Sequence, residues 1–486
     1  MKKASILTIA LALLPLSGCM VGPKYKTPPA IVAPSFKEAP PASFAEQDGW
    51  KPGQPSDTKL KGDWWTMFGD AQLNALETQV DTANQTIKAA EANFRAARAQ
   101  IGYNRANEAP TIGVSPSIST VRDSANQPYF SNGLANNGSG NFTLPVDLNY
   151  EIDLWGRIRR SVTAAREQAQ ASNADLENAR LSLHAELAMD YFGLRWADAQ
   201  TKLLNDTVKA YQSALRLTQD RFEGGAAPQS DVTQAQTQLD QARVQLTDLE
   251  VQRTQYEHAI AVLIGKSPAE LTLAPLPLNF QAPAIPQIPG VMPAVLLERR
   301  PDIAADERRM AAANEQIGIA QAAYYPTLSL SAVAGFQGTS ALNWFTWPSR
   351  FWAVGPAFSE TLFDAGRRRS AKNITEAQYD ATVANYRQTV LTAFQQVEDN
   401  LAALRVLQNE AQQQHEATAS AEQSLDLFQT RYEGGVDTYL QVVTWQTAAL
   451  MNERNDLDIM QRRLDASVLL IKALGGGWDT TKMPHL

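Results

Sequence analysis

Few residues in this chain of 486 could do covalent or metal chemistry. Its one cysteine is Cys19, so no intramolecular disulfide can form. The four histidines are widely scattered, and none belongs to a Cys/His cluster with metal-ligand spacing. No nucleophile elbow, phosphate loop or His-centred triad is present either. We therefore predict that the protein is not an enzyme and has no catalytic residue, metal or cofactor, and that its histidines lie on polar helix faces or in the tail: His184, His258, His415 and His485.

The sequence around the cysteine indicates that its thiol carries a lipid. A positive start, Lys2-Lys3, is followed by an apolar stretch, Ile6 to Leu16, and then by Leu16-Ser17-Gly18-Cys19. This order resembles the lipobox of bacterial lipoproteins, which implies removal of residues 1–18 and acylation of Cys19 on its sulfur and its new amine. A buried structural thiol is the alternative. Met20 in the next position, instead of aspartate, implies sorting to the outer membrane.

Composition and charge narrow the classes of function. Hydrophobic residues make up 44% of the chain, enough for a large core, and charged residues only 19%. A net charge of −8 gives no support to nucleic-acid binding. Beyond the N-terminal stretch there is no apolar run of 18 residues, so we expect no transmembrane helix.

A proline-rich segment, residues 19–62, precedes the first helix. It cannot be helical, and it is either an extended strap leading from the lipid anchor or a disordered tether. The first helix opens near Trp64-Trp65 and is expected to run to about Asn107, with Asp70 as its cap.

The apolar period then changes from that of a helix to that of a strand. Between Thr143 and Ile152, apolar and polar residues alternate over the length of a transmembrane β-strand, whose polar side would face water inside a barrel. The partner strand is Thr111 to Val121, and the Asn/Gly/Ser-rich loop Arg122 to Gly140 between them would be extracellular. A soluble hairpin packed on the helices is the alternative.

Two long proline-free stretches, 156–222 and 366–432, predict helices of roughly 100 Å each. Each ends at a pair of glycines and is followed by a return helix, 229–265 or 438–474. The second long helix carries two apolar seams with coiled-coil spacing, about 100° apart, so it can pack against a neighbour on each side. One seam is Ile374, Ala377, Ala381, Ala384 and Leu391, and the other is Val383, Tyr386, Val390, Ala393 and Val397.

The second half of the chain repeats the first. Arg221-Phe222-Glu223-Gly224-Gly225 recurs as Arg431-Tyr432-Glu433-Gly434-Gly435, and Gly156-Arg157 recurs as Gly366-Arg367. The unit is a helix, a β-hairpin, a long helix, a reversal and a return helix. We place the first unit at 63–275, with its hairpin at about 108–155, and the second at 291–478, with its hairpin at about 325–365.

Counting these elements predicts an oligomer. Four strands per chain cannot close a barrel, and a membrane tolerates no open sheet edge. Three copies would supply about twelve strands, within the range of closed barrels with an open lumen. The predicted fold class is therefore a mixed α and β membrane protein with an internal two-fold repeat. It is a homotrimer whose transmembrane β-barrel continues into an α-helical barrel, although counting alone also allows a tetramer.

A series of motifs in fixed order covers nearly the whole mature chain. They are Val21-Gly22-Pro23-Lys24-Tyr25, Trp64-Trp65-x-x-Phe68-Gly69-Asp70, Asp153-Leu154-Trp155-Gly156-Arg157, Leu297-Glu298-Arg299-Arg300-Pro301-Asp302, Tyr325-Pro326-Thr327, Leu362-Phe363-Asp364-Ala365-Gly366-Arg367 and Ala473-Leu474-Gly475-Gly476-Gly477-Trp478. Together they resemble the bacterial outer membrane factors, the TolC-like outer membrane efflux proteins, in the lipoprotein branch that serves RND-type tripartite pumps.

The resemblance implies a homotrimeric duct in the outer membrane with a long periplasmic tunnel. It also implies a collar built from about 60–72, 266–295 and 475–486. The duct would passively conduct what a periplasmic adaptor and an inner-membrane RND-type pump deliver. The helix reversals would form its gate and touch the adaptor. The implied gate residues are Tyr432, Asp437, Tyr439, Leu440 and Asp231, and the implied adaptor contacts are Gly224, Gly225, Gly434 and Gly435.

Other interpretations remain at this stage. Some family members carry aspartates where Gln441 and Thr444 stand here, so we expect no acidic ring at those positions, although Asp231 in the first repeat could supply one. Tyr432 and Asp437 could be solvated turn residues. We interpret Arg300 and Asp302 as structural helix-start groups. As a whole, the protein could instead be a periplasmic coiled-coil lipoprotein acting as scaffold or adaptor, or the exit duct of a type I secretion system. The sequence does not identify the exported substrate.

Overall fold

The computed structural model describes residues 20–29, 35–38, 62–122, 124, 126, 138–276, 296–478, 483–484 and 486. The expected signal peptide, Cys19, and most of the loop 122–140 lie outside these residues, as does His485. The first half contains η2 (Trp64–Phe68), α3 (Ala71–Ala83), α4 (Gln85–Arg105), η3 (Ala106–Glu108), β1 (Thr111–Val114), β2 (Ser117–Val121), β3 (Ser139–Ile152), α5 (Arg157–Glu223), α6 (Gln229–Leu263) and η4 (Pro268–Glu270). The second contains α7 (Leu296–Arg299), α8 (Pro301–Ala322), β4 (Thr327–Gly338), η6 (Trp347–Ser349), β5 (Arg350–Ser359), α9 (Arg367–Glu433) and α10 (Tyr439–Ala473).

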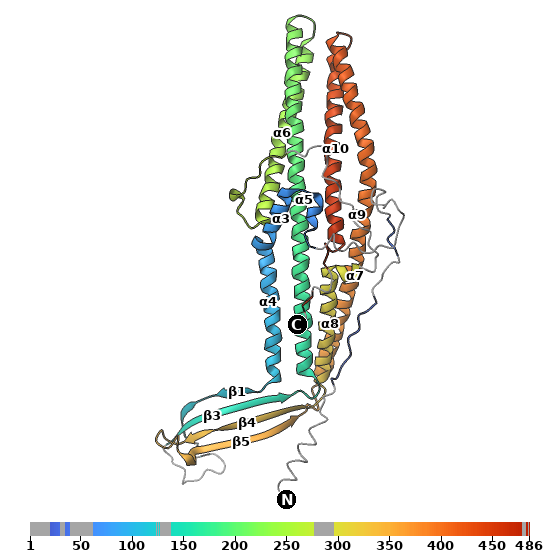
Figure 1. The fold of residues 1–486 in the computed structure, drawn as a ribbon. Coiled ribbons are helices and arrows are strands. Elements are labelled where there is room, and N and C mark those ends of the chain that lie inside the picture. The colour runs from blue at the N-terminus through green and yellow to red at the C-terminus, as the bar shows by residue number, and fades with distance from the viewer. Residues whose placement is uncertain are drawn as a thin grey trace.

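The molecule is a long bundle of helices standing on one end of a tilted sheet (Figure 1). Near the sheet, α4, α5, α8 and α9 run side by side, and farther away α6 packs on α5 and α10 packs on both α9 and α5. The two long helices have 67 residues each and the two return helices 35 each. At about 1.5 Å per residue, each long helix spans roughly 100 Å.

Both long helices begin in the same way. Gly156 and Gly366 precede them with φ of 80° and 88°, a left-handed conformation that only glycine adopts readily. An aspartate upstream then accepts a backbone N–H from the first turn: Asp153 from Arg159 at 2.9 Å, and Asp364 from Arg368 at 3.1 Å. A carboxylate at this end also complements the helix dipole. The recurring Gly-Arg motif thus encodes a recurring helix start.

The sheet is antiparallel, with the strand order β1-β3-β4-β5, and β2 also pairs with β3. Residues paired across strands share a face, and one face is mainly apolar, with Thr120 and Arg350 as exceptions. Its rows include Ile112, Leu148, Ala332 and Val354, and Val114, Val146, Ala334 and Trp352. The opposite face carries mainly polar and small residues, as in the row Thr111, Asn149, Ser331 and Gly355, and also Val333 and Phe351.

Two elements expected to be continuous are broken. The first helix stops at Asn84 because its Oδ1 accepts the N–H groups of Thr86 and Ile87, at 2.8 and 3.1 Å, and so caps a new helix. Its Nδ2 donates to the carbonyl of Leu263 at 2.8 Å, which ties the break to the end of α6. The strand expected at 111–121 is divided into β1 and β2 by Ser115-Pro116, since proline offers no N–H to the ladder.

The largest hydrophobic core lies midway along the helices, where η2 and α3 wrap around α5. Trp64, Leu73, Tyr191 and Phe192 are almost fully buried there, together with residues of α6, α9 and α10.

Asp70 caps α3 as expected, accepting from the N–H groups of Gln72 and Leu73 at 2.8 and 3.0 Å. Among the described residues, no helix combines the length and the apolar character needed to cross a membrane.

Candidate functional site

The site suggested by the sequence is the pair of helix reversals at the end farthest from the sheet (Figure 1). Both reversals have the same backbone hydrogen bonds. The N–H of Ala226 donates to the carbonyl of Arg221 at 2.7 Å, and that of Val436 donates to Arg431 at 2.9 Å. The N–H groups of Gly225 and Gly435 donate three residues back, each at 2.9 Å. This pattern is the Schellman motif, which ends a helix at a left-handed residue.

The four glycines of the tips therefore divide into two kinds. Gly225 and Gly435 have φ of 72° and 74°, so the turn itself requires glycine there. Gly224 and Gly434 are right-handed, and an added Cβ would meet its nearest atoms at 3.3 and 3.4 Å. The turn does not require glycine at these two positions, which leaves room for a role in contacting another protein.

The predicted gate tyrosines are buried between the two hairpins. Tyr432 is 5% exposed and Tyr439 is 2% exposed, and their ring centroids are 5.3 Å apart. They share a hydrophobic cluster with Tyr211 and Leu239 of the first hairpin and with Val442. Burial, reinforced by the neighbouring Tyr432, raises the pKa of Tyr439 to about 12, so its hydroxyl stays neutral. The alternative in which Tyr432 is a solvated turn residue is wrong.

Arg221 joins the two hairpins, and the sequence offered no sign of this. Its guanidinium donates to the carbonyl oxygens of Tyr432 at 2.7 Å and Glu433 at 2.5 Å, and its centre lies 4.5 Å from the Tyr432 ring centroid. These carbonyls are among the last of α9, where a cation is favoured by the helix dipole. The contact spans 211 residues of sequence, beyond the reach of any local pattern.

The remaining predicted gate residues lie on the surface of the tips. Asp437 pairs with Arg431 of its own turn at 2.5 Å between Oδ2 and Nε. Leu440 is 56% exposed on the first turn of α10. Asp231 stands in the first turn of α6, with only a long 3.4 Å contact to Ser230 from a side chain. Within one chain, therefore, the structure brings Tyr432 and Tyr439 together and leaves Leu440 exposed. Asp231 is half-buried, and its charge helps to raise the pKa of Tyr439.

His184 is placed differently from the sequence prediction. His258 and His415 are exposed, but His184 is buried under η2, stacked on Trp65 with ring centroids 4.4 Å apart. Its Nδ1 lies 2.7 Å from Glu77 and its Nε2 3.3 Å from Asp81. Burial acts to lower the pKa of His184, but these two carboxyl groups outweigh it and raise the pKa to about 9. Burial also raises the pKa of Glu77 to about 7.

Arg300 and Asp302 have the contacts of structural residues. Arg300 is buried, and its Nε and Nη2 donate to the two oxygens of Asp302 at 3.0 and 2.6 Å. Its Nη1 donates to the carbonyl of Ala473 at 3.0 Å, which joins α8 to the end of α10.

The described part of the chain contains no group of three or more His, Cys, Asp or Glu side chains that could hold a metal ion.

Known proteins share this arrangement along almost its whole length. Residues 77–266 and 292–476 match the family described as outer membrane efflux protein. The chain is 31% identical over 477 residues to a toluene efflux pump outer membrane protein, TtgC, of Pseudomonas putida, covering 98% of this chain and 96% of that one. It is 32% identical over 481 residues to outer membrane protein OprJ of Pseudomonas aeruginosa, covering 98% and 97%. A solved structure of the outer-membrane channel OprN matches with a TM-score of 0.83 at 27% identity, covering 95% of this chain and all of OprN.

Proposed function

This chain belongs to the outer membrane efflux protein family, and from that membership we propose that three copies form one continuous exit duct. As a member of this family it is an outer-membrane component of an efflux system. In the proposal, the sheets of three copies close a twelve-stranded transmembrane barrel. The helices continue it as a periplasmic tunnel, and the tips form its gate. The observation that carries the proposal is a sheet that is mainly apolar on one face and mainly polar or small on the other.

The two faces of the sheet fit a barrel wall in a membrane. Ile112, Val354 and Trp352 are among the exposed members of the apolar face, and exposing such a face to water is unfavourable. Lipid relieves that cost, while Asn149 and Ser331 on the opposite face suit a water-filled lumen. Among the described strands, both edges of the sheet are unpaired, because β5 pairs only with β4, and β1 and β2 pair only with β3. Pairing between copies would satisfy these edges.

One apolar seam of α9 is also left uncovered within a single chain. Of the two seams on α9, the one containing Tyr386, Val390, Ala393 and Val397 is buried within the chain. The other is exposed along its length, from Ile374 to Leu391. Because α9 and α4 stand at the two edges of the helix row near the sheet, this seam is free to pack on α4 of the next copy.

The partners follow from the energetics of the duct. Because the curated relatives are outer-membrane components of efflux pumps, transport would be driven from the inner membrane by an RND-type pump and transmitted by a periplasmic adaptor. The adaptor would contact the tips at Gly224 and Gly434. Cys19 would carry the lipid that anchors the strap in the membrane. TtgC is by name a toluene efflux protein, and whether this chain exports similar apolar solvents is open to direct test.

Electron microscopy of the protein extracted from outer membranes tests the architecture. We expect a three-fold hollow tube on the order of 100 Å or longer, with a detergent belt at one end. The trimer should also migrate differently on gels before and after heating. A monomeric rod without a belt would instead support the scaffold function.

Single-channel recording in a planar bilayer tests the gate. Leu440→Ala would remove an apolar ring around the three-fold axis, and Asp437→Ala would release the Arg431 pair. We expect both changes to raise the conductance. Val436→Ala is a matched control, because this exposed tip residue has no assigned gate role. Unchanged conductance in both gate variants would exclude these residues from the gate.

A further inference from the structure

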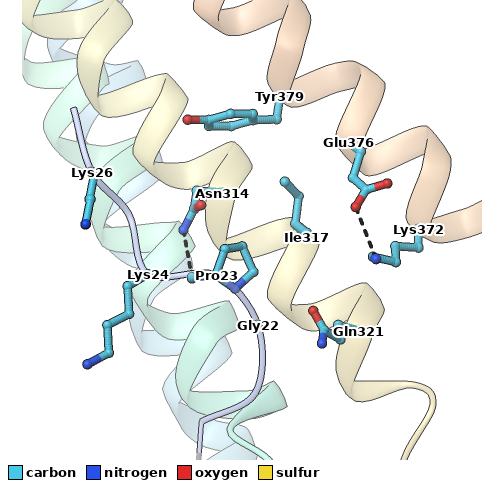
Figure 2. A pocket seen from close by; sticks show the side chains of 10 residues that line it. All are labelled: Gly22, Pro23, Lys24, Lys26, Asn314, Ile317, Gln321, Lys372, Glu376 and Tyr379. Carbon is cyan, nitrogen blue, oxygen red and sulfur yellow. Dashed lines mark hydrogen bonds and ion pairs between the residues drawn. The ribbon is translucent and has the colours of Figure 1, made fainter. Parts of the chain in front are cut away.

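A cleft of about 620 Å³ lies beside the N-terminal strap, close to the sheet end of the helices. The strap residues Gly22, Pro23, Lys24 and Lys26 form one side of it, α8 forms the floor and α9 the other side (Figure 2). None of the assigned gate or tip residues lines this cleft.

The strap is held rigidly at this point. Arg160 is buried, forms an ion pair with Glu315 at 2.6 Å, and donates to the carbonyl of Val21 at 2.7 Å. Gly22 has φ of 108°, and a Cβ on it would lie 2.6 Å from the Cα of Gly318, so only glycine allows the strap to approach α8 this closely. Because these contacts fix one wall, the cleft is already formed without a ligand.

The charged groups of the cleft are mainly cationic. Lys24 and Lys26 are exposed on the strap, and Lys372 stands across from them on α9. The single carboxylate among the described lining residues, Glu376, lies 3.2 Å from Lys372 and neutralises one of the three lysines. Neutral hydrogen-bonding side chains complete the lining, from Gln321, Asn314 and Tyr379. A cleft with this excess of positive charge suits an anionic group with several acceptor oxygens, such as a phosphodiester.

The sheet-side end of the cleft stands at the height of lipid headgroups. Gln321 lies at the end of α8, just before β4, and Lys372 lies in the second turn of α9. The headgroup layer extends roughly 5–8 Å beyond each side of the hydrocarbon. At about 1.5 Å per residue, Gln321 and Lys372 lie about 1.5 and 7.5 Å along their helices from the sheet-side ends, so this end of the cleft is level with the layer. At the same level Trp155 stacks on Tyr325 with ring centroids 4.8 Å apart, and such aromatic residues are typical of the membrane–water interface.

An oligomer would leave the cleft open. Lys372, Glu376 and Tyr379 lie on the side of α9 that faces α8 and the strap. The seam from Ile374 to Leu391, which we assign to the next copy, lies on a different side of the same helix. The cleft therefore faces the surroundings of the tube and not the neighbouring chain.

We propose that this cleft binds the phosphate headgroup of an anionic phospholipid in the periplasmic leaflet of the outer membrane. The inference rests on the proposed membrane insertion of the sheet, and it is independent of the gate. The lysines hold the phosphate, and the bound lipid fixes the height of the strap next to its own anchor.

Native mass spectrometry of the full-length protein tests the proposal. The protein is released from nanodiscs that contain phosphatidylcholine and phosphatidylglycerol in equal amounts. We expect the wild type to retain phosphatidylglycerol preferentially. Each lysine near an anionic group contributes about a factor of five, so K24Q/K26Q/K372Q should lower retention by more than tenfold. Glu376→Gln should raise it, because it frees Lys372 from its internal partner.

Two control variants show whether lipid retention depends on positive charge at the cleft. K88Q/K202Q/K209Q removes three lysines far from the sheet and should retain as much lipid as the wild type. Lys→Arg at the three cleft positions should keep the lipid, which shows that charge and not folding is responsible. The same spectra report whether the protein is trimeric, so failure of the duct is distinguished from failure of the cleft. Equal retention by the wild type and the triple Gln variant would overturn the proposal. Binding of inorganic phosphate without phosphatidylglycerol would also overturn it.

Discussion

The two helix tips share a backbone turn but differ in what holds them. In the first tip, Arg221 reaches across to the carbonyls of Tyr432 and Glu433 on the other hairpin. In the second, the corresponding Arg431 turns back onto Asp437 of its own turn. Phe222 of the first tip is 42% exposed, whereas its counterpart Tyr432 is buried between the hairpins. The two tips therefore have the same backbone turn but different side-chain contacts.

This difference separates a fixed contact from an exchangeable one. Arg221 is partly buried and binds carbonyls at a helix end, so it ties the two hairpins of one chain together. The Arg431 side chain is 56% exposed, and an ion pair in that setting contributes little and can change partners readily. If the gate opens by exchange of contacts, we expect the exchange at Arg431 and Asp437, with the two hairpins of each chain moving as a unit.

The largest expected effect is the loss of Arg221. Arg221→Ala removes two hydrogen bonds from a charged donor and one cation–π contact, at a cost to tip stability of about 2–4 kcal/mol. Arg431→Ala, the matched change in the other repeat, should cost less than about 1 kcal/mol. Hydrogen exchange of the amides at 432–438 measures both. Equal protection in the two variants would show that Arg221 is not the stronger contact.

The second-largest expected effect is the loss of tip stability when the glycines of the two pairs are replaced. Gly435→Ala places a side chain in a left-handed conformation, at a cost of about 1–2 kcal/mol, and Gly225→Ala should behave alike. Gly434→Ala and Gly224→Ala should cost less, because φ is negative there and the added methyl group meets only a tight contact of 3.3–3.4 Å with a backbone carbonyl oxygen. Protease cleavage at the tips reports the difference. At Gly434, replacement by Trp should leave the trimer intact but block efflux, and loss of the trimer would contradict an adaptor role.

A smaller effect, outside both tips, comes from His184. Its pKa of about 9 lies above the usual value near 6.5, so its contribution to stability is complete below about pH 6.5 and is lost as pH rises through 9. The thermal midpoint should therefore fall between about pH 6.5 and 9.5, and His184→Gln should reduce that fall. His258→Gln provides the exposed control. A wild-type midpoint independent of pH over this range would refute the assignment.

The sequence predicted elements whose signals are local. The long helices lie within one residue of their expected bounds, because a Gly-Arg motif marks each start and a glycine pair marks each end. The division of the first helix was missed, although Asn84 before Gln85-Thr86 is a recognisable capping residue. The strand break was missed as well, although Pro116 cannot donate to a ladder. In both cases the prediction followed a longer periodic pattern of apolar residues and overlooked the single residue that interrupts the element.

The contacts within the site were harder to predict from the sequence than the helices and strands. His184 was expected on a polar helix face, but it is buried against Glu77, which is 107 residues away in the sequence. The contact from Arg221 to the second tip is likewise a product of packing two hairpins side by side. The sequence does place Arg221 and Tyr432 at the reversals, but no period or motif indicates that they touch.

The equal lengths of the repeats limit how such a tube could evolve. Because α5 and α9 have 67 residues each and α6 and α10 have 35 each, both tips end at the same level. One added residue in a single helix would displace its tip by about 1.5 Å and rotate it by about 100°. Seams with coiled-coil spacing return to register only after seven residues. A relative with a longer or shorter tunnel should therefore carry insertions or deletions of whole heptads, about 10.5 Å each, in all four helices at once.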